Sequence, residues 1–321
     1  MKNRFIAEFR NLKYIVENAD SVLLVAHTRP DPDTIGANVA LKEYLMDLGK
    51  RADIVCFDPF PDYLRSLFVH EFHAPDQVDW GSYQAIIASD SVNRGFDRMM
   101  KQYVTDKHAT VLIDHHPDID TMGDVVMIDA SYSSTCEILF NYFESSHIPI
   151  TSRMATALLT GISGDTGSFQ HSCTTPRVME IASILMKRGA PLSKISDSVF
   201  TNKKISTLKL WGRAFAKAKI NQRNGMIVSA LTQQDIAECE ASTNDVNQVA
   251  TILNTVPGTK FSLVFFQLND TTVKGSLRSE EGKGVDVSSI AHQFGGAGHR
   301  LASGFEMAGR IQETQEGWMV V

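Results

Sequence analysis

Apolar and polar positions follow two different rhythms along the first 190 residues. Short apolar runs of strand length recur between longer segments in which apolar residues have the spacing of a helix. The predicted strands are 22–26, 52–57, 85–89, 110–113 and 125–128, and the predicted helices are 1–17, 36–48, 133–144, 152–162 and 175–187. Strands that alternate with helices predict an α/β fold with a mostly parallel sheet.

The alternation of strand-like and helix-like patterns is interrupted between about 189 and 204, a segment that contains Pro, Ser and Lys. A helix is then expected at 205–218, and a smaller α/β domain follows. Its predicted strands are 226–231, 261–268, 272–279 and 304–307, and its predicted helices are 245–254 and 285–294. We therefore divide the chain into an N-terminal domain, a linker with its connecting helix and a C-terminal domain, at 1–190, 191–218 and 219–321, with a cleft between the domains.

The loop after the first predicted strand carries three side chains of metal-binding type. His27, Asp31 and Asp33 lie between this strand and the next helix. Pro32 restricts the backbone around it, so the carboxylates of Asp31 and Asp33 can point in different directions. An aspartate before a helix is also a common N-cap, and a capped turn explains this loop about as well when it is taken alone.

Two further strands and one helix run into residues of the same kind. Asp90 follows the third strand, although a turn or cap residue is the commoner explanation for one such aspartate. The fourth strand leads into Asp114, His115 and His116, and adjacent imidazoles can face a metal and a substrate separately. Asp165 lies in a glycine-rich turn that allows close approach of a phosphate or metal.

The four loops together indicate a metal site more strongly than any one of them does alone. In open parallel sheets, ligands bind beyond the carboxyl ends of the strands, so all four loops are expected at one edge. Their mixture of carboxylate and imidazole favours two divalent ions that clamp the attacking and leaving oxygens of a phosphoryl displacement. A serine hydrolase and a P-loop ATPase or kinase are not supported, because neither G-x-S-x-G nor G-x-x-x-x-G-K-[ST] occurs.

The composition of the chain limits the molecules that it is expected to bind and the compartment in which it is expected to work. The net charge of -6 argues against a protein that coats long nucleic acid, because such binding needs many Lys and Arg side chains, whereas a small nucleotide remains compatible. No apolar run reaches the roughly 20 residues of a membrane span. The four cysteines are far apart without a C-x-x-C pair, so a cytoplasmic location is expected.

The motifs resemble those of the DHH phosphoesterase superfamily, named for a triplet that stands here at 114–116. H-T-R-P-D-P-D-T-I-G, from His27, resembles the family's H-x-x-P-D-x-D-x-x-G, and G-I-S-G-D-T-G-S-F, from Gly161, resembles its G-I-x-x-D-T-G-x-F. The segment G-G-A-G-H at 295–299 is similar to the glycine-rich substrate loop of the associated C-terminal domain. Pro32, Ala37 and Ala297 depart from the usual pattern without removing a ligand.

The resemblance implies a set of roles. One metal would be held by His27, Asp31 and Asp90, and the second by Asp33, Asp90, His115 and Asp165, with Asp90 as the bridge. Manganese is the first choice, with magnesium or cobalt as alternatives. A hydroxide between the ions would attack phosphorus, His116 would contact the phosphate or assist the leaving oxygen, and Asp114 would orient the histidines. The substrate-binding residues of the C-terminal domain would be Ser276, Arg278, Gly296, Gly298 and His299.

Within the superfamily, the chain resembles the branch that degrades oligoribonucleotides of two to five nucleotides and dephosphorylates 3'-phosphoadenosine 5'-phosphate. The predicted partners are therefore short RNA or nucleotide bisphosphates, with no long nucleic acid and no membrane. Two alternatives stay open, an inorganic pyrophosphatase or exopolyphosphatase and a non-catalytic nucleotide-binding module. The oligomeric state is also open, a homodimer being one option.

Overall fold

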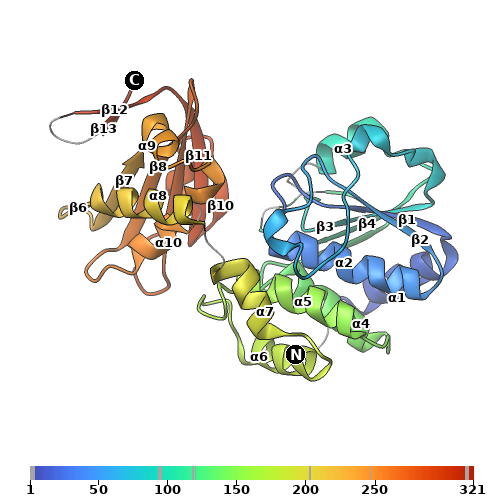
Figure 1. Cartoon of the computed structure of the whole chain (residues 1–321). Coiled ribbons are helices and arrows are strands. Elements are labelled where there is room, and N and C mark those ends of the chain that lie inside the picture. The colour runs from blue at the N-terminus through green and yellow to red at the C-terminus, as the bar shows by residue number, and fades with distance from the viewer. Residues whose placement is uncertain are drawn as a thin grey trace. The chain divides into compact units, whose positions relative to one another are not determined.

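The chain folds into two compact units, Met1–Asn202 and Lys203–Val321, here called the N-terminal and C-terminal units (Figure 1). The computed structural model describes residues 4–92, 96–117, 119, 121–201, 204–246, 248–314 and 318–321. No helix in these ranges is both long enough and apolar enough to cross a lipid bilayer. The functional division predicted at 191–218, and the cleft between the domains, stay predictions.

The N-terminal unit contains a five-stranded sheet in the order β2-β1-β3-β4-β5, in which every pair of neighbours is parallel. The strands are β1 (Ser21–Val25), β2 (Arg51–Val55), β3 (Ala85–Ser89), β4 (Ala109–Asp114) and β5 (Val125–Ile128). The α/β class and the parallel sheet predicted from the apolar pattern are confirmed. Because the strands are parallel, their carboxyl ends lie at one edge.

The helices of this unit are α1 (Ile6–Asn18), α2 (Pro32–Asp47), α3 (Asp97–Tyr103), α4 (Thr135–Ser145), α5 (Ser152–Asp165), α6 (Pro176–Lys187) and α7 (Leu192–Ser196). A π-helical turn, Asp197–Thr201, follows α7. Three predicted helix boundaries are wrong, the first being the start of α1, which was predicted at residue 1 and lies at Ile6. Helix α2 begins at Pro32, four residues before the predicted Gly36, because Asp31 caps it and proline suits a first turn. Helix α5 continues to Asp165, which the sequence placed in a turn beyond the helix.

Both faces of this sheet are buried, as expected for parallel strands. On β1, Val22 and Leu24 belong to a core with α1, α2, α4, α5 and α6. The alternate residues, Leu23 and Val25, pack on the other face with side chains that include Met99 of α3. Figure 1 shows α3 across the sheet from α1 and α2. The helices leave the loops after the strands as the place where polar side chains can meet.

The C-terminal unit contains a six-stranded mixed sheet in the order β10-β11-β9-β8-β7-β6, in which only the β7–β8 pair is parallel. Its strands are β6 (Lys219–Asn221), β7 (Met226–Leu231), β8 (Phe261–Asn269), β9 (Thr272–Ser279), β10 (Ala297–His299) and β11 (Ala302–Ala308). A separate pair follows, β12 (Ile311–Glu313) and β13 (Trp318–Val320).

The helices of the C-terminal unit are α8 (Ile205–Ala216), α9 (Gln233–Glu238), α10 (Val249–Asn254) and α11 (Val287–His292). The single helix predicted at 245–254 is wrong, because Gln248 has a positive φ of 75° and separates a short 3-10 turn, Thr243–Val246, from α10. Val264 and Phe266 of β8 pack in one core with Leu210 of α8 and Val249 of α10.

Candidate metal centre

Asp31 uses its two carboxylate oxygens differently. Its Oδ1 caps α2 by accepting hydrogen bonds from the backbone N–H groups of Asp33 and Thr34, at 3.0 and 3.2 Å. Its Oδ2 lies 3.2 Å from Nε2 of His27, a side chain that follows β1 and is 1% exposed. The cap and the ligand proposed as alternative explanations of this loop are therefore compatible in one side chain.

Asp33 is fully buried, and the first turn of α4 holds it. Its Oδ2 accepts a hydrogen bond from the backbone N–H of Thr135 at 2.7 Å, and its Oδ1 accepts one from the N–H of Cys136 at 3.0 Å. Burial and the charges of Asp165 and Asp90 raise the pKa of the Asp33 carboxyl. A carboxylate gathered this closely with two others needs a cation or a proton to balance it.

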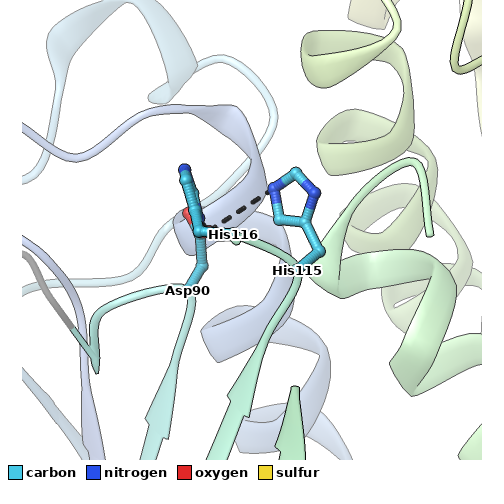
Figure 2. A group of neighbouring side chains, drawn as sticks. All are labelled: Asp90, His115 and His116. Atoms are coloured by element: carbon cyan, nitrogen blue, oxygen red, sulfur yellow. Dashed lines mark ion pairs between the residues drawn. The ribbon is translucent and has the colours of Figure 1, made fainter. Parts of the chain in front are cut away.

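Asp90 lies at the middle of the cluster. It follows β3 with a positive φ of 59°, a strained conformation for a residue with a side chain, and it is 1% exposed. Its Oδ2 is 3.4 Å from Nε2 of His27, and its Oδ1 is 3.3 Å from Nδ1 of His116 and 3.8 Å from Nε2 of His115. Figure 2 shows Asp90, His115 and His116 converging from the ends of neighbouring strands.

The surroundings of Asp90 fit a metal ion. Within the described part of the chain, neither of its buried oxygens accepts a hydrogen bond of ordinary geometry. Burial opposes its ionisation, but the imidazoles of His116 and His27 lower its pKa well below the usual range. A charged, buried carboxylate without ordinary hydrogen bonds is the kind of group that a divalent cation stabilises.

His115 joins Asp90 to the other end of the cluster. Its Nε2 is 2.9 Å from Oδ2 of Asp165, the last residue of α5, and 3.9 Å from Oδ2 of Asp33. Three groups of metal-binding atoms overlap here, each with its atoms within 4.8 Å of one another: His27, Asp31 and Asp90; Asp90, His115 and His116; Asp33, His115 and Asp165. The structure thus brings together all six side chains that the sequence named as metal ligands, together with His116.

Asp114 is absent from these groups and contacts His116 instead. Its Oδ1 accepts hydrogen bonds from the backbone N–H of His116 at 2.9 Å and from Nδ1 of the ring at 2.8 Å. Its other oxygen accepts one from the backbone N–H of Val92 at 3.3 Å. A carboxylate that accepts a hydrogen bond from Nδ1–H leaves Nε2 of the imidazole to act as the acceptor or donor toward a substrate.

The carboxylates of the cluster raise the pKa values of two of its histidines. Burial disfavours protonation of His27, but Asp31 and Asp90 outweigh it and raise its pKa to about 10. Burial likewise opposes the charge of His115, and Asp165 outweighs it so that the pKa again reaches about 10. Protons on these rings balance the carboxylates, and a divalent ion would displace them on binding.

The candidate substrate residues of the C-terminal unit lie on neighbouring strands. Ser276 and Arg278 of β9 pair with Gly304 and Ala302 of β11, and His299 of β10 pairs with the same Ala302. These β9 side chains are half-buried and lie on the side of the sheet where α8 and α10 cover β7 and β8. Burial lowers the pKa of the Arg278 guanidinium, which donates to the carbonyl oxygen of Leu277 at 2.8 Å.

The glycines of the β10–β11 hairpin have steric reasons to be glycine. A Cβ on Gly296 would lie 2.3 Å from the carbonyl oxygen of Gly304, and one on Gly298 would lie 2.6 Å from that of Ala302. Gly298 also has a positive φ of 139°. The glycines are therefore needed because the segment before and within β10 packs directly against the backbone of β11 and the residues at its start.

Two contributors were missed in the sequence. Lys274 is half-buried and lies on the same face of β9 as Ser276, so the two-residue period of a strand could have indicated it. The α4 amides that hold Asp33 were also missed. Ser134, the N-cap of α4, accepts a hydrogen bond from the N–H of Glu137, and this Ser-x-x-Glu spacing is a recognisable helix start.

Comparison with known proteins identifies both units. The DHH family's N-terminal domain matches residues 21–162, and the DHHA1 domain matches residues 224–316. The bifunctional oligoribonuclease and PAP phosphatase NrnA of Bacillus subtilis (strain 168) is 27% identical over 293 residues, which are 89% of this chain and 88% of that protein.

Two solved structures share the fold. An exopolyphosphatase-related protein from Bacteroides fragilis superposes with a TM-score of 0.86 and 23% identity, over 97% of this chain and 92% of that one. RecJ from Thermus thermophilus, in complex with Mn2+, superposes with a TM-score of 0.55 and 13% identity, over 96% of this chain and 52% of that one. At these identities the likeness concerns the fold alone.

Proposed function

Because this chain belongs to the DHH family, as its motifs predicted, we propose that it is a metal-dependent phosphoesterase of short nucleotides. Its substrates are linear oligoribonucleotides of two to five nucleotides and 3'-phosphoadenosine 5'-phosphate, both hydrolysed to nucleoside monophosphates. The similarity to the relative named for both activities, across 89% of the chain, supports this choice. The observation that carries it is the overlap of three carboxylate–imidazole groups through Asp90 and His115.

We assign two divalent ions to this cluster. His27, Asp31 and Asp90 would hold the first, and the second would be held by Asp33, Asp90, His115 and Asp165. The mixture of carboxylate and imidazole suits manganese, with magnesium or cobalt as substitutes. When bound, such a pair lowers the pKa of water and neutralises charge on the phosphoryl oxygens.

The chain's own contribution to proton transfer is assigned to His116. Asp114 holds Nδ1 of this ring at 2.8 Å, which fixes the tautomer and directs Nε2 toward the substrate. Nε2 then either donates to a phosphate oxygen or protonates the leaving oxygen. Asp114 acts through His116 and orients it.

Binding of the remainder of the substrate is assigned to the half-buried side chains of β9 and to the β10–β11 hairpin. Arg278 and Lys274 supply positive charge for a second phosphate, and Arg278 can make two parallel hydrogen bonds to it. Ser276, Gly298 and His299 lie on these strands, and Gly296 directly precedes β10. The net charge of -6 and this small basic area favour short substrates over polymers.

A substrate panel with the purified protein and manganese tests the proposal, with a chelator as the control. We expect a 5'-phosphorylated dinucleotide and 3'-phosphoadenosine 5'-phosphate to be hydrolysed, and pyrophosphate and a long single strand to react far more slowly. Much faster cleavage of pyrophosphate would identify a pyrophosphatase instead. Nucleotide binding without any turnover would identify a non-catalytic module.

A further inference from the structure

Two helices that carry candidate ligands approach each other closely over glycines. Helix α2 carries Asp33 in its first turn, and α5 ends at Asp165. A Cβ on Gly36 of α2 would lie 2.3 Å from the backbone carbonyl oxygen of Ala157 in α5. Backbone atoms cannot give way as a flexible side chain can. The two helices therefore reach this separation only because position 36 has no side chain.

Gly161 of α5 lies closest to the candidate metal centre. A Cβ on this glycine would be 2.7 Å from Oδ1 of Asp33 and 2.3 Å from Sγ of Cys136. The same Oδ1 accepts the backbone N–H of Cys136 at 3.0 Å, and Oδ2 accepts that of Thr135 at 2.7 Å. The Asp33 carboxylate is therefore closely surrounded. Backbone N–H groups in the first turn of α4 donate hydrogen bonds to it, and the backbone of α5 packs against it at Gly161.

We propose that Gly161 is a positioning residue for Asp33. Without a side chain at this position, the carboxylate can adopt the orientation in which both oxygens accept α4 amides and Oδ2 faces His115 at 3.9 Å. This inference rests on the proposed two-metal site and adds to it a residue that contacts neither ion. We expect a methyl group at position 161 to displace Asp33 and weaken the second ion, because the atoms nearest to it belong to Asp33 and Cys136 and none of them to His27, Asp31 or Asp90.

Two variants distinguish the proposed positioning of Asp33 from a simpler role of Gly161, which is packing against Cys136 alone. In the variant Gly161→Ala the new methyl overlaps both Sγ of Cys136 and Oδ1 of Asp33. In the double variant Gly161→Ala with Cys136→Ala, the sulfur is gone but the 2.7 Å approach to Oδ1 stays. The matched control is Gly212→Ala in α8, where an added Cβ meets nothing within 4 Å.

The experiment measures manganese stoichiometry and affinity by titration calorimetry, and the melting temperature in chelator by circular dichroism. We expect the wild type, Gly212→Ala and Cys136→Ala to bind two ions. Gly161→Ala and the double variant should bind one ion normally and the other roughly 10- to 100-fold more weakly. The double variant should also recover melting temperature relative to Gly161→Ala.

Normal binding of both ions by the double variant would reduce Gly161 to a packing role and overturn the proposal. Failure of the double variant to fold would overturn it too, because the closest remaining contact is with a carboxylate oxygen that can rotate away. A wild type that binds fewer than two ions would instead contradict the proposed function. The two failures are therefore distinguishable.

Discussion

At the scale of single residues, the metal centre depends on side chains that each satisfy two neighbours. Asp31 caps α2 with one oxygen and faces His27 with the other, and Asp114 holds both the backbone and the ring of His116. The sequence could name these residues because each follows an apolar segment. It could not show what holds Asp33, since the amide of Thr135 lies 102 residues further along the chain.

The role of Asp114 predicts a selective loss in Asp114→Asn. The amide oxygen binds the His116 ring more weakly than the carboxylate does and stabilises less of its positive charge. We expect kcat to fall by about 100-fold, in the range typical of proton-transfer residues, with two ions still bound. Steady-state kinetics and metal titration measure the two effects.

The matched control for this variant is Asp124→Asn. Asp124 accepts the backbone N–H of Thr110 at 2.7 Å, at the opposite end of β4. Its replacement should leave kcat within about twofold, because surface substitutions rarely reach a distant site. Equal losses in both variants would show that Asp114 contributes only to the stability of the strand.

Metal binding should release protons, with a sign set by the raised pKa values of His27 and His115. Both rings carry protons below their pKa of about 10 in the metal-free protein. Metal affinity should therefore increase with pH throughout the range below about 10 and level off above it. Calorimetry in buffers of different ionisation enthalpy counts the protons, and a pH-independent affinity without release would contradict the assignment.

The same shifts give the metal-free fold its own pH dependence. The unfolded chain loses its histidine protons near pH 6.5, whereas the folded chain keeps them up to about 10. This contribution to stability is complete below pH 6.5 and disappears as the pH rises through 10. Denaturant unfolding in chelator should thus show stability falling over this range, and a rising stability would be inconsistent with protonated rings.

At the scale of elements, strand ends were easier to predict than helix ends. The five apolar runs of the N-terminal unit became strands, since burial on both faces leaves a nearly continuous apolar signal. Part of the glycine-rich motif was misplaced, because Gly164 lies inside α5, where it permits close packing against Pro32 of α2, instead of lying beyond the predicted helix end at residue 162. Helix packing is a long-range property that local composition does not reveal.

The face of β9 predicts a substrate-binding defect in Arg278→Ala. Loss of the guanidinium should raise KM for 3'-phosphoadenosine 5'-phosphate about 10-fold or more, as expected when a charge-assisted pair is removed, while metal stoichiometry stays at that of the wild type. The control is Arg223→Ala, an exposed arginine after β6 at the opposite edge of the sheet. A loss of metal with unchanged KM would contradict the assignment of Arg278 to substrate.

At the scale of the whole molecule, the two units divide the chemistry. Every carboxylate–imidazole group found among the described residues lies in the N-terminal unit, and each unit has hydrophobic cores of its own. The presence of two units was predictable from the break in pattern near residue 190. How the units are arranged depends on contacts that no local pattern encodes.

This division predicts that metal stabilises one unit only. At a free manganese concentration of 100 times Kd, each of the two ions should stabilise the N-terminal unit by about 2.7 kcal/mol, and a total of about 5.4 kcal/mol raises its melting temperature by roughly 10–20 °C. Differential scanning calorimetry with manganese and with chelator should show one transition that shifts and one that does not. Equal shifts of both transitions would contradict a site confined to the N-terminal unit.

The proposed hydrolysis depends on two ions held around Asp90 by side chains from separate loops. Anomalous diffraction at the manganese edge, from crystals grown with the metal, tests it most directly. We expect two peaks, one contacted by His27 and Asp31, the other by Asp33, His115 and Asp165, and both by Asp90. A single peak, or peaks that Asp90 does not contact, would contradict it.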